Sequence, residues 1–271
     1  MKKIFYLLFV FPLFIGCSGE NDASSDIAFN ENIHKDSIQN TLGAQNMILN
    51  TCDDWHTFFE NPPEDIEIEE RYILKIEANS ANELKVRDFY PEPDGISDII
   101  QKFYTFNEKE NDLKSNYPLY STATLEMCDV EYLKLEKQIE DIDEVADKIK
   151  YDYLVSAQKI WGKKREAIQL LSRETGLTEL REISKQAHIK IVVENGVKNE
   201  LISSIYSVIK ECILYLRNKK SIELFGESYI YYRNSINPDH KAQCYLIELS
   251  YPLIIAVFDS EGKIMRIVES L

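Results

Sequence analysis

Glycine and histidine are both scarce in this sequence, and their scarcity excludes several familiar kinds of active site. The chain of 271 residues has nine glycines and four histidines. Its glycines form no G-x-G-x-x-G, no phosphate-binding loop and no G-x-S-x-G, the motifs on which nucleotide sites and the hydrolase nucleophile elbow depend. Acidic pairs occur throughout so acidic a chain, and none stands out as a catalytic pair. We therefore expect no catalytic residue and no enzyme.

The histidines are not spaced as metal ligands. Two of the four fall in expected tether or turn regions, and His188 is expected to face outward on a strand beside Lys190. The segment 52–56 (Cys-Asp-Asp-Trp-His) groups a thiol, carboxylates and an imidazole. Its spacing matches no zinc pattern, and no second ligand pair follows at a suitable distance. We expect neither a metal site nor a cofactor.

Positive charge is also in deficit. The sequence has 31 Lys and Arg against 46 Asp and Glu, which gives a net charge of −15. Such a chain repels nucleic acid and anionic lipid headgroups, so we expect neither as a partner. A merely soluble acidic surface would account for the charge equally well.

Long apolar runs are missing except for one short run at the start. Lys2 and Lys3 precede an uncharged segment, Ile4 to Ile15, which is too short at about 1.5 Å per residue to cross a bilayer core of roughly 30 Å. Residues 1–16 are therefore expected to be a secretory signal peptide. The junction Phe14-Ile15-Gly16-Cys17 resembles the lipobox of bacterial lipoproteins, although Phe14 stands where leucine is usual. An ordinary signal peptide with a coincidental cysteine is the alternative.

The lipobox resemblance implies that Cys17 is diacylated and becomes the mature N-terminus. Two acyl chains anchor a protein stably, whereas one chain holds only marginally. Residues 17–60 are expected to be this lipidated end and a flexible tether, because residues 18–40 are polar and show no hydrophobic period. The protein is then expected in a bacterial cell envelope, facing the periplasm or exposed at the surface.

Four cysteines remain beyond Cys17, and two interpretations of them stay open. An even number in an oxidising compartment permits two disulfides with three possible pairings among Cys52, Cys128, Cys212 and Cys244. Cys212, however, lies on an apolar helical stripe with Ile205 and Ile209, where a buried thiol packs as a small hydrophobe.

The order of expected elements from residue 61 to residue 271 predicts one α+β domain. Its sheet is expected to be mostly antiparallel, with helices on one face. Strands are predicted at 71–77, 84–86, 188–193, 253–258 and 263–268, and helices near 96–103, 198–217 and 239–250.

Residues 129–176 differ from the rest, because apolar residues recur at steps of three and four among dense charges. This pattern predicts a long helical insertion of two helices, with Gly176 as the C-terminal cap. A helical hairpin that folds back is favoured over a coiled-coil partner arm, since the apolar repeat is short and irregular.

Several segments match, in order, the landmarks of one known family. They are 61–65 (Asn-Pro-Pro-Glu-Asp), 71–77, 82–87, 96–103 (Ile-Ser-Asp-Ile-Ile-Gln-Lys-Phe), 107–112, 181–187, 216–218, 225–229 and 251–254. In this order the chain resembles the periplasmic domain of the ExbD/TolR family, especially its long Bacteroidetes type. The family's Asp-Arg-Gly-Thr-Ser-Tyr after the strand 188–193 is replaced here by Glu194-Asn195-Gly196-Val197-Lys198-Asn199.

The resemblance implies a domain that pairs with itself and contacts envelope partners. Family members carry an aspartate in a transmembrane helix, but Ile4 to Ile15 has no acidic residue, so this chain is not expected to conduct protons. We expect an accessory lipoprotein of a Ton/Tol-type energy-transduction or envelope complex, with a homodimer and ExbB-, ExbD- or TonB-like components as partners. The alternative is a free-standing lipoprotein that binds a ligand or peptide. Expected contact residues lie on an edge strand 188–193, its turn and the outward face of 129–176: Lys190, Glu194, Asn195, Gly196 and Lys198.

Overall fold

The computed structural model describes residue 59 and residues 68–107, 116–146, 148–184 and 186–269. The expected signal peptide, Cys17, the tether and Cys52 lie outside these residues. The described strands are β1 (Ile73–Ala78), β2 (Leu84–Val86), β3 (Tyr120–Thr124), β4 (Glu179–Ile183), β5 (His188–Val193), β6 (Ile255–Asp259) and β7 (Ile264–Val268). The helices are α3 (Ile96–Tyr104), α4 (Leu125–Glu140), α5 (Lys148–Thr175), α6 (Asn199–Phe225), α7 (Tyr229–Arg233) and α8 (Pro238–Ser250), with 3-10 turns at Glu70–Tyr72 and Pro93–Gly95.

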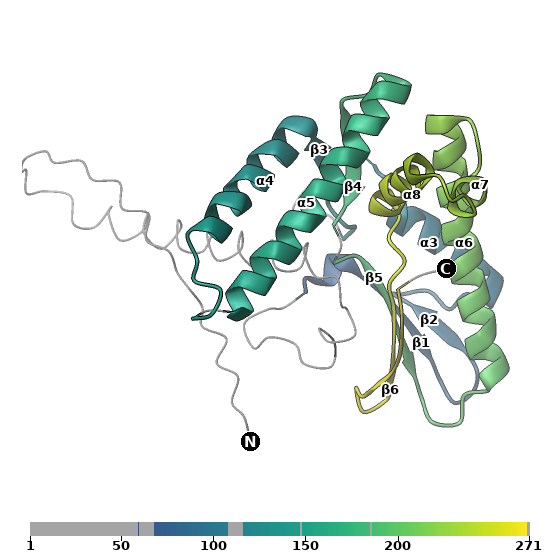
Figure 1. The fold of residues 1–271 in the computed structure, drawn as a ribbon. Helices are drawn as coiled ribbons and strands as arrows, with labels where there is room; N and C mark the ends of the chain where they lie inside the picture. The colour runs from purple at the N-terminus through teal and green to yellow at the C-terminus, as the bar shows by residue number, and fades with distance from the viewer. Residues whose placement is uncertain (1–58, 60–67, 108–115, 147, 185, 270–271) are drawn as a thin grey trace, which may run out of the picture. The chain divides into compact units, whose positions relative to one another are not determined.

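The main sheet has five strands in the order β2-β1-β5-β6-β7 (Figure 1). The predicted α+β class is confirmed, but the expectation of a mostly antiparallel sheet needs correction. The three central strands β1, β5 and β6 are parallel, and only the outer pairs β1–β2 and β6–β7 are antiparallel. Parallel neighbours need long crossover connections, and helices supply them here between β1 and β5 and between β5 and β6.

Strand β5 lies at the centre of the sheet, so the prediction that residues 188–193 form an edge strand was wrong. His188 was also expected to face outward, but its side chain is only 1% exposed. The alternation of Ile189 and Ile191 with polar residues indicated one buried face of the strand. It did not indicate that the opposite face, which carries His188, is also covered. On that second face the ring of Phe59 lies 5.1 Å from the His188 ring and 6.1 Å from the Phe258 ring.

The principal core lies between the sheet and two helices, α3 and α6, on one of its faces (Figure 1). This arrangement confirms the predicted placement of helices. The predicted face of α3 supplies Ile96, Ile100 and Phe103 to the core, each at most 1% exposed. The core also contains Leu74, Ile76, Ile189, Ile191, Val257, Ile205, Ile209, Ile213 and Leu216 from the strands and from α6.

The predicted helical insertion is confirmed, and it is a hairpin. Helices α4 and α5 lie side by side and pack through Leu135, Leu154 and Ala157 (Figure 1). Helix α5 ends at Thr175, and Gly176 takes φ +75° and donates its N–H to the Ser172 carbonyl at 2.9 Å. This is the left-handed cap that the sequence predicted. The sequence did not predict the antiparallel ribbon β3–β4, from which the hairpin extends.

A second core joins this insertion to the rest of the domain. Ala167, Ile168 and Leu171 of α5 pack against Leu246 and Leu249 of α8. The Ser250 hydroxyl at the end of α8 donates to the Arg181 carbonyl on β4 at 3.2 Å. Among the helices of the described residues, none combines the length and apolar character that crossing a membrane requires.

The described cysteines favour the buried-thiol interpretation. Cys128, Cys212 and Cys244 are all buried and free, so none of the three takes part in a disulfide. Burial raises the pKa of both the Cys128 and the Cys244 thiols to about 11. These thiols therefore stay protonated and pack as small apolar groups.

Candidate functional site

The turn after β5, which the sequence singled out, is bound to the turn between β1 and β2. The Glu194 N–H donates to the Ala78 carbonyl at 3.0 Å, and the Glu194 carboxylate accepts from the Ser80 N–H at 2.9 Å. The Lys198 N–H donates to the Asn82 side-chain carbonyl at 2.9 Å. Two turns that are more than a hundred residues apart in the sequence are thus joined at one end of the sheet.

The expected contact residues do not all meet at this turn. Glu194, Asn195, Gly196 and Lys198 are exposed there, and Gly196 has φ +93°, a conformation that favours glycine. Lys190 lies four residues before Glu194 in the chain, which places it about 13 Å from the turn at roughly 3.3 Å per strand residue. Its ammonium lies 4.6 Å from the centroid of the Phe258 ring. The structure therefore brings four of the five residues together and separates Lys190.

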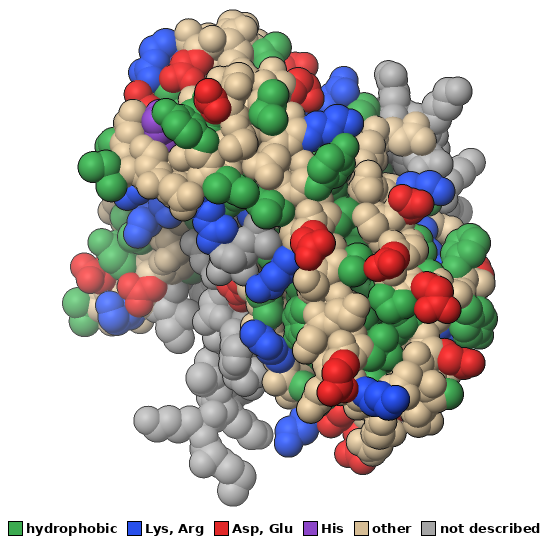
Figure 2. Space-filling view, turned by 90° about the vertical axis from the view of Figure 1, so that its right-hand side faces the viewer, with side chains coloured by type: hydrophobic (Ala, Val, Ile, Leu, Met, Phe, Trp, Pro, Cys, Tyr) green, Lys and Arg blue, Asp and Glu red, His purple; other side chains and the backbone are tan. Residues whose placement is uncertain are grey.

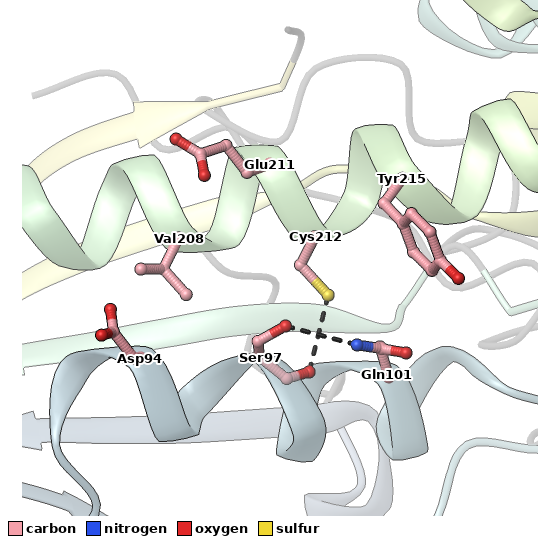
Figure 3. A pocket seen from close by; sticks show the side chains of 7 residues that line it. All are labelled: Asp94, Ser97, Gln101, Val208, Glu211, Cys212 and Tyr215. Carbon is pink, nitrogen blue, oxygen red and sulfur yellow. Dashed lines mark hydrogen bonds between the residues drawn. The ribbon is translucent and has the colours of Figure 1, made fainter.

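A groove that the sequence did not indicate lies between α3 and α6. It has a volume of about 330 Å³ and is open to solvent. Figure 3 shows that one wall comes from the start of α3 and the other from successive turns of α6. The α6 residues of this wall recur at steps of three and four, and residues at that spacing share one face of a helix. The lining residues are Asp94, Ser97, Gln101, Val208, Glu211, Cys212 and Tyr215.

Hydrogen bonds fix the floor of the groove. The Cys212 thiol donates to the Ser97 carbonyl at 3.5 Å, and the Gln101 amide donates to the Ser97 hydroxyl at 3.3 Å (Figure 3). Burial raises the pKa of the Cys212 thiol, the hydrogen bond to Ser97 lowers it, and the Asp98 carboxylate raises it. The net upward shift keeps the thiol protonated, so Cys212 is a poor nucleophile.

Tyr104 extends the same face of α3 inward, because it follows Ser97 and Gln101 at i+7 and i+3. Its side chain is 0% exposed, and its hydroxyl has no hydrogen-bond partner among the described residues. Burial raises the Tyr104 pKa, while the Arg217 charge lowers it and Cys212 raises it. Tyr104 belongs to the principal core and is not among the residues that line the groove.

A buried polar network lies further along α6. Arg217, which is 3% exposed, donates to the Tyr251 carbonyl at 2.9 Å and to the Tyr229 hydroxyl at 3.2 Å. Tyr229 in turn donates to the Glu248 carboxylate at 2.5 Å, and burial raises the Tyr229 pKa to about 12. The network joins α6, α7 and α8. The sequence feature that could have indicated this network is a lone arginine, Arg217, directly after Leu216 at the end of an apolar stripe.

The groove thiol is protonated, and the polar groups of the network are occupied with internal hydrogen bonds. Within the described residues, no three His, Cys, Asp or Glu side chains gather closely enough to hold a metal ion. No protein-family model, no curated protein and no solved structure matches this chain.

Proposed function

We propose that the protein is a membrane-anchored lipoprotein that works by protein–protein contact as an accessory of a Ton/Tol-type energy-transduction or envelope complex. The observation that carries the proposal is the order of elements around one sheet. A hairpin (β1–β2), a helix (α3), the strand β5 and a helix (α6) follow the order of landmarks by which the sequence resembles ExbD/TolR periplasmic domains.

The N-terminal sequence supports an anchored and non-conducting role. The segment Ile4 to Ile15 has no carboxylate that could carry a proton within a membrane, and Gly16-Cys17 supplies an acylation site. An anchor confines the domain to the surface of its membrane. The effective concentration of the domain near membrane-bound partners rises without any new contact.

The edges of the sheet differ in how readily they could pair with another chain. At the β2 edge, the backbone N–H and C=O of Val86 are both bonded to Phe89, at 2.9 and 3.1 Å. These bonds occupy backbone groups of a strand that has only three residues, so β2 is a poor site for pairing with another chain. At the other edge, no described strand pairs with the outer side of β7, and Met265 on that strand is 59% exposed. Strand β7 therefore replaces β5 as the edge that could add a strand from a second copy or a partner.

In-cell crosslinking tests the proposal. A photoreactive residue at Lys198 or at Met265 should give self-adducts or adducts with ExbB-, ExbD- or TonB-like proteins. The same probe at Ile236, which is 94% exposed on the connection between α7 and α8, is the matched control for exposure alone. Equal adducts at all three positions, or none at Lys198 and Met265, would contradict a specific contact role.

The groove between α3 and α6 favours a second function, a free-standing lipoprotein that binds a peptide or ligand. A purified full chain that retains a small molecule tightly, together with an absence of crosslinks at Lys198 and Met265, would support this alternative. Binding of a ligand with specific crosslinks retained would leave the contact function in place.

A further inference from the structure

We propose that the α3–α6 groove is a receptor for a cationic side chain, that of an arginine or a lysine presented by a partner protein. Because a cation carried on a polypeptide implies a protein partner, this assignment rests on the contact function proposed above. It adds a site and a recognition chemistry that neither the sheet edge nor the turn at 194–198 provides.

Charge complementarity is the first reason. Asp94, in the 3-10 turn before α3, and Glu211 on α6 line the groove from opposite sides, and no lysine or arginine is among the described lining residues. Asp98 is close enough to raise the pKa of the Cys212 thiol in the floor. On the face shown in Figure 2, acidic and basic side chains both lie among exposed apolar ones. A cation placed here meets carboxylates without a competing positive charge from the lining.

The second reason is the set of hydrogen-bonding groups within the groove. The amide nitrogen of Gln101 is already directed to the Ser97 hydroxyl, which leaves its carbonyl oxygen as an acceptor. An ammonium or guanidinium group carries the donor that this carbonyl oxygen lacks.

The third reason is the apolar and aromatic part of the wall. Val208 contributes an aliphatic surface, and the ring of Tyr215 is in the wall with 54% of the residue exposed. Arginine and lysine side chains pack their stems on such surfaces while the charged end meets polar groups. Rings elsewhere in this chain accept the same contact, since Arg181 lies 4.3 Å from the Phe106 centroid and Arg266 lies 5.2 Å from the Tyr206 centroid.

The dimensions of the groove favour one side chain of a polypeptide over a whole small molecule. Its volume of about 330 Å³ is at the lower end of the range for ligand pockets, roughly 300–1,000 Å³, and it opens directly to solvent. A single long side chain can enter while its backbone stays outside. The walls of α3 and α6 are held by the packed core, so the groove is formed before the partner arrives.

Binding of short peptides to the purified full chain tests the inference. The probes are a fluorescent peptide with one central arginine and the same peptide with citrulline, which has a similar shape without the charge. Isothermal titration and fluorescence anisotropy should show binding of the arginine peptide that weakens with salt. Replacing arginine by citrulline should weaken it roughly tenfold or more, as expected for lost charge-assisted bonds.

Matched variants separate the groove from the acidity of the chain as a whole. Asp94→Asn with Glu211→Gln should weaken arginine-peptide binding roughly tenfold or more, and Tyr215→Ala should weaken it several-fold. The control, Asp141→Asn with Glu144→Gln at the exposed end of the α4–α5 hairpin, removes the same charge and should bind like the wild type. All these positions are exposed, so each variant should melt at the wild-type temperature.

Equal binding of the arginine and citrulline peptides, or equal losses in the groove and control variants, would overturn the assignment. These outcomes would leave the crosslinks at Lys198 and Met265 unchanged. Failure of the groove is therefore distinguishable from failure of the proposed function.

Discussion

Two buried tyrosines differ in whether their hydroxyls have partners, and this difference predicts opposite effects on stability. Tyr104→Phe removes a hydroxyl without a described partner, so the free energy of unfolding should stay constant or rise by up to about 1 kcal/mol. Tyr229→Phe leaves Arg217 and Glu248 each short of a bond, so it should cost about 1–3 kcal/mol. Urea unfolding of both variants measures the difference. A larger loss of stability for Tyr104→Phe than for Tyr229→Phe would contradict the absence of a hydrogen-bond partner for the Tyr104 hydroxyl among the described residues.

His188 predicts a pH dependence of stability at the scale of one residue. Burial lowers its pKa from 6.5 to about 4, the backbone bond to Gln186 raises it, and the Lys190 charge lowers it. His188 binds a proton more readily in the unfolded chain than in the folded chain. It therefore costs the fold no stability above pH 6.5, and the free energy of unfolding decreases as the pH falls from 6.5 towards 4. At pH 4.5 the loss from His188 alone should be about 2–3 kcal/mol.

The variant His188→Leu isolates this contribution from the titration of carboxylates. Denaturant unfolding at pH 7.5 and at pH 4.5 should show a smaller loss of stability in the variant than in the wild type. Equal losses in the two proteins would show that burial next to Phe59 does not hold His188 neutral.

At the scale of elements, one nearly buried ion pair joins the helical hairpin to the ribbon. The Lys164 ammonium on α5 lies 2.8 Å from the Glu182 carboxylate on β4, with side chains 10% and 15% exposed, and it also lies 4.6 Å from the Trp161 ring centroid. Removal of one partner leaves the other charge buried. Lys164→Met alone should therefore destabilise the protein by about 3 kcal/mol.

The double variant Lys164→Met with Glu182→Leu should recover most of that loss, because an apolar pair of similar volume can replace a buried ion pair. Thermal and urea unfolding of the single and double variants form a double-mutant cycle. If the double variant were as unstable as the sum of the single variants, the pair would be a packing contact without electrostatic coupling.

At the scale of the whole molecule, the proposed lipid anchor at Cys17 would decide where the protein works. Cys17→Ser should abolish labelling by a metabolic fatty-acid probe and release the protein from the membrane fraction, because the thiol is the expected attachment point. Mass spectrometry of the mature N-terminus checks the same site. Equal labelling of both proteins would contradict acylation at Cys17.

The sequence by itself determined several of the local elements, because they depend on short-range patterns. The period of Ile96, Ile100 and Phe103 gave α3, the alternation around Ile189 gave β5, and Gly176 marked the end of the helical hairpin. Each of these signals is contained within a few residues. Helix caps, turn glycines and apolar periods act over that same range.

Only the tertiary structure decided how these elements combine. Whether β5 is an edge or a central strand depends on its pairing with β1 and β6, and the burial of His188 depends on Phe59 and on neighbouring strands. The α3–α6 groove joins Asp94 to Glu211 across more than a hundred residues, with no motif in either segment. Strand neighbours and facing helix surfaces are chosen by long-range packing in the core, which a pattern within one segment does not record.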